Sequence, residues 1–458
     1  MIKTISPIDG SLYYSAEEHN LNDISKSLDL AEKALPVWSD MTIQQRATYV
    51  KKFIEVIVAN TEDIAREITW QMGRPISQSP WEISGFSERA NYMVDIAEEA
   101  LQEHPVSDDE AYKRWMAKVP LGILAVLSPW NYPFLTSVNA IIPALMAGNV
   151  VILKHSFQTP LVAERYMQAA IKGGFPDGVF QILHLNHQNT ASFIAHNKIN
   201  GVCFTGSVAG GIAVQNALNK KFIPCGLELG GKDPAFVRAD ADLEHAVENL
   251  VDGSFFNSGQ SCCGIERIYV HENLYDQFVE GFVEITKKYN LGNPLESNVN
   301  LGPMVKTEAA NYVRNQIDQA LYSGAKSLVD ESLFPASQKG SPYLSPHVLI
   351  NVNHSMDIMM EESFGPVIGI MRVKNDSQAI QFMNDSPYGL TASLWTKDID
   401  AAQKLGAKIE TGTVFMNRCD YLDPALAWTG VKHSGRGVTL SKIGYDHVTR
   451  IQSFHFRK

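Results

Sequence analysis

Short, β-rich apolar runs alternate with amphipathic helical stretches along most of this chain, and this alternation limits the folds open to it. Apolar residues recur every three to four positions in segments such as 50–68 and 243–251, a spacing that predicts helices. Strands that alternate with helices predict a mostly parallel sheet covered on both faces, and therefore an α/β protein. The predicted strands are Ile123–Leu127, Val150–Leu153, Gly201–Phe204, Ala235–Val237, Ile268–Val270, Val367–Val373 and Thr413–Met416.

Composition narrows the class of protein further. With 458 residues, 45% hydrophobic and 19% charged, the chain has the apolar content of a globular protein of two or three domains. A formal net charge of −11 opposes binding to nucleic acid or to an anionic membrane, so we expect neither partner. Five cysteines, an odd number, imply no disulfide framework. No signal-peptide core or membrane-spanning stretch is found, and we expect a soluble, cytoplasmic protein.

A cysteine pair follows a turn of small residues. Residues 255–263 read Phe-Phe-Asn-Ser-Gly-Gln-Ser-Cys-Cys, and such a turn after a helix exposes a side chain beside free backbone N–H groups. A free thiol has a pKa near 8.5, and nearby amide dipoles or a cationic ring could lower it enough to form a thiolate nucleophile. The alternative is that Cys262 and Cys263 are buried, inert thiols, as free cysteines usually are.

A second motif offers a base. Residues 228–232 read Glu-Leu-Gly-Gly-Lys, so Glu228 is a candidate general base once a nucleophile lies nearby. The same stretch, from Gly226 to Lys232, matches most of a phosphate-binding P-loop. However, Asp233 stands where a P-loop needs serine or threonine for magnesium, which argues against a nucleotide triphosphatase. No metal-binding motif occurs, and we predict no metal site.

Three further motifs are weak individually. Asn131 follows the predicted strand 123–127 and could donate to a developing oxyanion, or only to its own loop. Residues 204–211, Phe-Thr-Gly-Ser-Val-Ala-Gly-Gly, follow a strand and open a helix, which suits a pyrophosphate. Residues 361–366, Glu-Glu-Ser-Phe-Gly-Pro, place polar side chains before an apolar strand.

Together these five motifs resemble those of the NAD(P)-dependent aldehyde dehydrogenase superfamily, in the same order and over nearly the whole chain. Glu228 and Cys262 are 34 residues apart, as the family places its base and nucleophile. The resemblance implies that Cys262 attacks an aldehyde, that Asn131 holds the oxyanion and that Glu228 activates the water that hydrolyses the thioester. It implies cofactor contacts from Lys154, Gly206, Ser207, Gly230, Glu362, Phe364 and Trp130.

Departures from the family leave the cofactor undecided between NAD and NADP. Members that prefer NAD usually carry a glutamate three residues after the position of Lys154, and here that residue is Phe157. A further glutamate of many members, proposed for proton relay, falls on Thr439, which puts that relay in doubt.

The resemblance also suggests the substrate pocket. Members that oxidise succinate semialdehyde typically place arginines where this chain has Asn139 and Phe256, and neither of these binds a carboxylate in bidentate fashion. Tyr132, Phe256, Leu422 and Trp428 are expected to form an apolar, aromatic mouth for a medium aliphatic or aromatic aldehyde. Arg418, next to this mouth, keeps an acidic semialdehyde as the alternative.

The fold implied by the resemblance has a Rossmann-like cofactor domain (1–102 and 119–228), a catalytic α/β domain (229–430) and a small β flap for oligomerisation (103–118 with 431–458). The family forms homodimers or homotetramers through that flap. Three other functions stay open: a cysteine-dependent acyl transferase or thioesterase without redox chemistry, a reductase that passes the thioester to coenzyme A, and a non-catalytic member of the fold.

Overall fold

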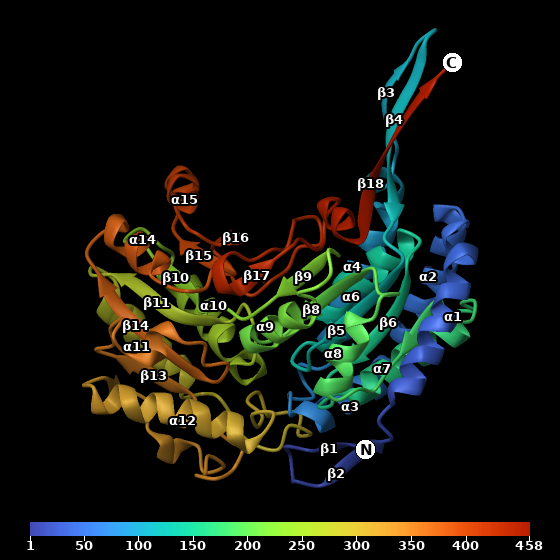
Figure 1. Ribbon diagram of the computed structural model, residues 1–458. Helices are drawn as coiled ribbons and strands as arrows, with labels where there is room; N and C mark the ends of the chain where they lie inside the picture. Colours follow the sequence, from blue (N-terminus) through green and yellow to red (C-terminus); the bar gives the residue numbers. More distant parts are fainter.

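The computed structural model describes residues 1–458 as two lobes that lie side by side, with a narrow arm projecting from them (Figure 1). Each lobe is built around its own mostly parallel sheet, and a separate three-stranded sheet forms the arm. The predicted combination of two α/β units and a small β flap is confirmed.

The sheet of the first lobe has the strand order β17-β9-β8-β5-β6-β7, with β17 alone antiparallel to its neighbour. Its strands β5 and β6 are almost fully buried, which is why they read as continuous apolar runs. Their bounds are β5 (Ile123–Ser128), β6 (Val150–His155), β7 (Phe180–Ile182), β8 (Gly201–Thr205), β9 (Cys225–Glu228) and β17 (Gly435–Arg436).

The order in which the chain visits the strands of this lobe indicates where a ligand would bind. From β5 the chain moves outward to β6 and β7 through α6 (Pro133–Met146) and α7 (Pro160–Lys172). It then returns to the other side of β5, to β8 and β9, through α8 (His187–Ala195) and α9 (Val208–Ala217). The strand order therefore reverses between β5 and β8, and ligands of open α/β sheets bind beyond the carboxyl ends of the strands at such a reversal.

Four long N-terminal helices and one short helix complete the first lobe. Thr42 caps α2 reciprocally with Gln45, as a capping box requires, and the helix buries its apolar stripe against the core. Helix α4 packs along α6, which brings α4 to the edge of the site described below. The bounds are α1 (Leu21–Ser39), α2 (Ile43–Val58), α3 (Thr61–Met72), α4 (Trp81–Asp95) and α5 (Ala97–Ala100).

The second lobe has the strand order β12-β13-β14-β11-β10-β15-β16, parallel except for β12. Alternate residues of β10 enter opposite cores, with Phe236 in one cluster and Ala235 and Val237 in the other. The strands are β10 (Asp233–Val237), β11 (Ile265–His271), β12 (Lys326–Ser327), β13 (His347–Ile350), β14 (Val367–Val373), β15 (Thr391–Trp395) and β16 (Thr413–Met416). The helices are α10 (Leu243–Phe255), α11 (Tyr275–Thr286), α12 (Thr307–Tyr322), α13 (Asp357–Met360), α14 (Asp376–Asn384) and α15 (Ile399–Gly406).

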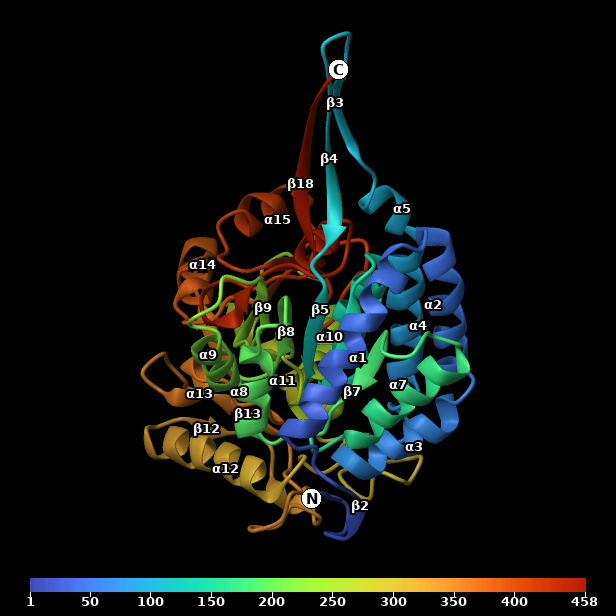
Figure 2. The same ribbon diagram turned by 45° about the vertical axis from the view of Figure 1, so that its right-hand side comes forward.

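The arm consists of β3 (His104–Asp108), β4 (Tyr112–Pro120) and β18 (Thr449–Arg457), with β4 in the centre. It extends away from both lobes (Figure 2). The rings of Trp115 and Phe454 stack 4.4 Å apart across β4 and β18, while both outer strands keep an unpaired edge.

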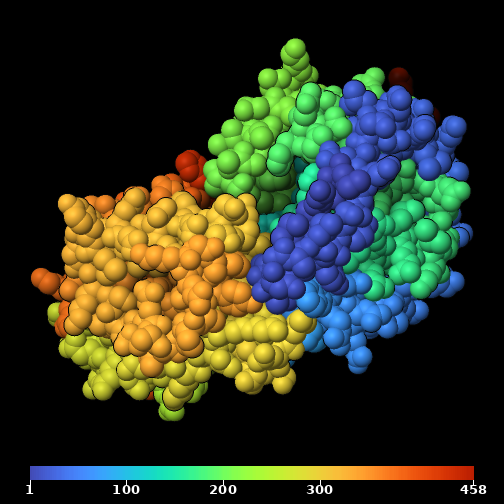
Figure 3. All heavy atoms as spheres, turned by 90° about the horizontal axis from the view of Figure 1, so that it is seen from below, coloured from blue at the N-terminus to red at the C-terminus, as the bar shows by residue number.

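The N-terminal hairpin of β1 (Ile2–Ile5) and β2 (Leu12–Ala16) lies at the opposite end of the molecule from the arm. Seen from below, the N-terminal segment reaches the boundary with the second lobe (Figure 3), where the hydroxyl of Tyr343 donates to the carbonyl of Ile8 at 3.1 Å. None of the helices combines the length and apolar character that a bilayer-crossing segment needs.

Candidate active site

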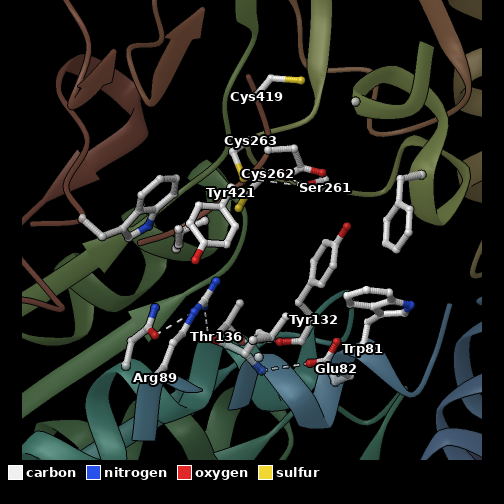
Figure 4. Close-up of a pocket in the computed structure, with 18 of the residues that line it drawn as sticks. Trp81, Glu82, Arg89, Tyr132, Thr136, Ser261, Cys262, Cys263, Cys419 and Tyr421 are labelled. Atoms are coloured by element: carbon white, nitrogen blue, oxygen red, sulfur yellow. Dashed lines mark hydrogen bonds between the residues drawn. The ribbon is translucent and has the colours of Figure 1, made fainter. Parts of the chain in front are cut away.

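A cavity of about 410 Å³ lies between the two lobes, and residues from both line it (Figure 4). Glu228, at the end of β9, and Tyr132, between β5 and α6, come from the first lobe. Cys262 and Phe256 come from the segment between α10 and β11 in the second. Leu422 and Trp428 complete the set of predicted pocket residues, so the nucleophile, the base and the four predicted wall residues share one cavity.

The turn before Cys262 has a left-handed backbone. Asn257, Ser258 and Gly259 have φ values of 52°, 56° and 71°, conformations that non-glycine residues adopt only when their surroundings hold them. Asn257 accepts a hydrogen bond from Arg74 Nε at 3.2 Å, and Ser258 Oγ donates to the carbonyl of Gly302 at 2.9 Å. A Cβ on Gly259 would lie 2.3 Å from the carbonyl oxygen of Gly365, so only glycine fits there. The turn is therefore fixed from outside and presents Cys262 to the cavity.

Cys263 has different surroundings from Cys262. Its side chain is buried and its Sγ lies 2.9 Å from Oδ1 of Asp420, which also accepts a hydrogen bond from Ser261. Hydrogen bonding with Cys262, followed by burial, raises the pKa of Cys263 well above its ordinary value. A thiol held protonated in this way is a poor nucleophile, which leaves Cys262 as the reactive member of the pair.

Asn131 lies between β5 and α6 and is buried. Its side-chain Nδ2 is 3.2 Å from the carbonyl of Gln260, which points the amide toward the turn that carries Cys262. Its backbone carbonyl accepts hydrogen bonds from the guanidinium of Arg74 and, at 3.3 Å, from the side chain of Asn257. The amide and the Cys262 segment are thus parts of one hydrogen-bonded unit.

A buried ion pair supports this unit, and sequence reasoning missed it. Arg74 Nη1 and Glu82 Oε2 are 2.5 Å apart, with both side chains at most 1% exposed. The other oxygen of Glu82 accepts the backbone N–H groups of Phe134 and Leu135 at 2.8 and 2.9 Å, in the first turn of α6. An anion at a helix N-terminus is favourable, so this carboxylate ties α4, α6 and Arg74 together. No sequence signal links Arg74 to Asn131, because 57 residues separate them.

The carboxyl group of Glu228 lies between two hydroxyls. Thr205 Oγ1 donates to Oε2 at 3.0 Å, and Thr439 Oγ1 donates to Oε1 at 2.5 Å. Burial raises the pKa of Glu228, and the two hydroxyls oppose that rise. Thr439, noted in the sequence only for the missing glutamate, therefore contacts the base directly.

A second cavity, of about 440 Å³, contains several of the predicted cofactor residues: Trp130, Ser207, Glu362 and Phe364 all line it. Ser207 caps α9, and the first N–H groups of a helix are suited to bind an anion. The rings of Trp130 and Phe364 meet edge to face, 5.7 Å apart. A helix N-terminus that donates to phosphate, aromatic rings that pack on a ring and a carboxylate that accepts from ribose hydroxyls together suit a dinucleotide.

Glycines allow close approach around the same cavity. A Cβ on Gly230 would lie 2.3 Å from Oε1 of Glu362, and the N–H of Gly231 donates to that oxygen at 3.0 Å. Burial raises the pKa of Glu362 to about 8. Gly206 donates its N–H to the backbone carbonyl of Glu228 at 3.0 Å, and neither Gly206 nor Gly230 lines either of the two cavities itself.

Lys154 lies outside both cavities, at the end of β6. Its Nζ is 5.0 Å from the centre of the Phe157 ring, and burial lowers its pKa to about 8. Lys232 is the lysine of the P-loop-like stretch. Its side chain is buried in an ion pair with Glu266 at 2.6 Å and is therefore not free to bind a phosphate.

Comparisons with known proteins agree with this geometry. The model of the aldehyde dehydrogenase family matches residues 1–454. The D-glyceraldehyde dehydrogenase (NADP(+)) of Picrophilus torridus is 30% identical over 99% of this chain and 92% of its own length. The succinate semialdehyde dehydrogenase [NAD(P)+] Sad of Escherichia coli is 31% identical over 98% of this chain and 96% of its own.

A solved structure gives the same result. Succinic semialdehyde dehydrogenase from Streptococcus pyogenes, in complex with NADP+, superposes with a TM-score of 0.94 at 26% identity and covers 100% of both chains. Because the family model spans nearly every residue and relatives match from end to end, the chain belongs to the aldehyde dehydrogenase family of oxidoreductases.

Proposed function

We propose that this enzyme oxidises an aldehyde to the carboxylic acid through a covalent intermediate on Cys262. The thiolate adds to the carbonyl carbon to give a thiohemiacetal, which becomes a thioester on loss of hydride. NAD(P)+, when bound, supplies the hydride acceptor. Glu228 then takes a proton from water, which attacks the thioester and releases the acid. The observation that carries the proposal is the shared cavity, which Cys262 and Glu228 enter from opposite lobes.

Asn131 and the backbone N–H of Cys262 are the proposed donors to the oxyanion that forms in both steps. Preorganised donors of this kind act where charge develops, without reorganisation of solvent. The ion pair of Arg74 and Glu82 would keep the Asn131 loop in place, through its contact with the Asn131 carbonyl.

Replacement of Asn131 by alanine tests this role. Loss of one oxyanion donor typically lowers kcat by roughly 10²–10³-fold, and we expect a loss of that size here. Steady-state kinetics would measure it, with the dissociation constant for NADP+ as the control that should stay unchanged. A loss under fivefold would assign the oxyanion to other donors.

Cofactor binding is assigned to the second cavity and its surroundings, with Lys154, Gly206, Ser207, Gly230, Glu362, Phe364 and Trp130 as the contributing residues. The chain is proposed to use NAD or NADP, because Phe157 supplies neither a carboxylate that repels a 2′-phosphate nor a cation that binds one. The domain of residues 1–102 and 119–228 would hold the cofactor, and 229–430 would hold the nucleophile.

The variant Phe157→Glu is expected to reduce kcat/KM for NADP at least tenfold while that for NAD changes less than threefold. The new carboxylate would stand near Lys154 and repel the dianionic 2′-phosphate. The matched control, Phe157→Gln, has the same shape without the charge and should affect NADP much less. Equal losses with both cofactors in the glutamate variant would remove Phe157 from the adenosine ribose site.

The aldehyde is proposed to carry an apolar body. Tyr132, Phe256, Leu422 and Trp428 offer aromatic and aliphatic surface to a medium aliphatic or aromatic group, and a semialdehyde with a short methylene chain would use the same walls. The test of the proposed function is a panel of aldehydes assayed with NAD and with NADP. Reduced nicotinamide and the carboxylic acid product should appear in equal amounts; a thioester transfer without reduced nicotinamide would point to the acyl transferase alternative.

The arm is proposed to join protomers into a homodimer or homotetramer in the cytoplasm. Both of its outer strands have free edges, and Val106, Ile451 and Phe456 are exposed on it. Unpaired edges with apolar residues are usually covered by another chain. Light scattering should give a multiple of the 50.7 kDa chain mass.

A further inference from the structure

We propose that Arg89 binds a carboxylate at the far end of the substrate, so that the enzyme prefers aldehydes that carry a terminal carboxylate group. This inference rests on the proposed function, because it places the aldehyde end at Cys262. It adds a specificity residue from α4, a helix that contributes none of the predicted site residues.

The guanidinium of Arg89 is buried at the cavity but has donors to spare. Its side chain lines the same cavity as Cys262, and the residue is 8% exposed. One nitrogen, Nη1, donates to the carbonyl of Leu135 at 2.6 Å and lies 3.5 Å from Oδ1 of Asn139. The other nitrogens have no protein acceptor, and no carboxylate forms an ion pair with the group.

The other buried arginines differ from Arg89 in this respect. Arg74, which lines the same cavity, is fully engaged by Glu82, Asn131 and Asn257. Arg46 and Arg267 donate to several backbone carbonyls away from the cavity. A buried guanidinium with unused N–H groups is costly, and an anion in the cavity would remove that cost.

The position of Arg89 suits the distal end of a substrate. In Figure 4 its guanidinium points into the cavity from the side of α4 and α6, while Cys262 faces the cavity from the opposite side. Tyr421 and Thr136 lie near the space between them, so an aldehyde bound at Cys262 would extend toward Arg89. Arg418, which the sequence suggested for this role, does not line the cavity and instead stacks on the ring of Tyr421 at 3.9 Å.

The surroundings of Arg89 favour a carboxylate over a phosphate. Glu88, Asp252 and Asp420 also line the cavity, and they would repel a dianion more strongly than a monoanion. The cavity also has apolar lining residues, Leu135 and Trp428 among them, beside the polar Thr136 and Asn139. A flat carboxylate can accept two parallel hydrogen bonds from one edge of a guanidinium, here the edge formed by Nε and Nη2, and this leaves a short methylene chain for the apolar lining residues.

The test compares aldehydes that differ only in the terminal group: succinate semialdehyde with butanal, and 6-oxohexanoate with hexanal. In wild type we expect a higher kcat/KM for each carboxylated member. In Arg89→Met that value should fall roughly 10- to 150-fold, the range for loss of a hydrogen bond to a charged group, mainly through KM. The uncharged members should change less than threefold. Arg89→Lys should recover part of the loss, since lysine keeps the charge without the bidentate geometry.

Arg418→Met is the matched control, since it removes an arginine that lies outside the cavity; any effect that it has through the ring of Tyr421 should be the same for the charged and the uncharged member of each pair. Equal losses for charged and uncharged aldehydes in Arg89→Met would overturn the proposal. If wild type oxidises none of these aldehydes, the proposed function fails instead. Should Arg89→Met not fold, two other measurements test the proposal. Arg89→Lys should show a reduced preference for the carboxylated aldehydes, and succinate should inhibit the oxidation of hexanal by wild type competitively. Absence of both results would also overturn the proposal.

Discussion

Replacement of Cys262 by alanine is expected to abolish aldehyde-dependent formation of reduced nicotinamide. Removal of a covalent nucleophile usually lowers kcat by roughly 10⁴- to 10⁶-fold, because what remains comes only from binding and oxyanion stabilisation. The fold should persist, since Cys262 is only partly buried. The hydrogen bonds that hold the preceding turn are made by Asn257 and Ser258 and not by the Cys262 side chain. Steady-state rates with the best aldehyde of the panel would measure the effect.

Cys263→Ala is the matched control for this experiment. Both variants remove one thiol from the same turn, but Cys263 is buried against Asp420 and its pKa is raised well above normal by hydrogen bonding with Cys262 and by burial. We expect the Cys263 variant to stay within tenfold of wild type, with an unchanged dissociation constant for the cofactor in both variants. Activity that survives in Cys262→Ala and disappears in Cys263→Ala would reverse the assignment.

The strands that the sequence predicted are those with dense apolar runs. The strands β5, β6 and β14 fall close to their predicted positions because both faces of each are buried and apolar side chains fill them. The prediction missed β15, which is fully buried yet reads Thr-Ala-Ser-Leu-Trp. The partner of Thr391 lies far away in the sequence: its hydroxyl donates to Asp233 at 2.6 Å. The residues next to β15 in the sequence do not indicate such a partner, so the strand could not be predicted from them.

In the candidate site, too, the sequence predicted the residues of local motifs and missed those that depend on distant contacts. Cys262, Glu228 and Asn131 each lie in a local motif, and so the sequence alone was enough to nominate them. Arg89 lies in the middle of an ordinary amphipathic helix, and nothing within α4 distinguishes it from a residue on the solvated face. Only the packing of α4 on α6 brings its guanidinium to the cavity. Residues that act through tertiary packing are thus the ones that motif reading leaves out.

Replacement of Glu228 by glutamine is expected to separate the two halves of the reaction. Among the residues of the protein, hydride transfer to bound NAD(P)+ requires only Cys262 and the oxyanion donors, so the first turnover should proceed at close to the wild-type rate. Hydrolysis needs a base to activate water, and its loss should lower kcat by roughly 10²- to 10⁴-fold. Rapid mixing would then show a burst of reduced nicotinamide of about one equivalent per active site, and mass spectrometry would find the acyl group on Cys262.

The pH dependence provides the control for this assignment, because the base acts only as the carboxylate. Burial raises the pKa of Glu228, so the carboxylate form is complete above that pKa and is lost as the pH falls through it. Turnover limited by hydrolysis should therefore fall on the acid side at a pH above the ordinary range of a glutamate, while the residual rate of Glu228→Gln should lack this limb. Multiple turnovers without a burst in the glutamine variant would mean that another group activates the water. In that case, the role of the Glu228 carboxylate would be structural, since both of its oxygens already accept hydrogen bonds from the hydroxyls of Thr205 and Thr439.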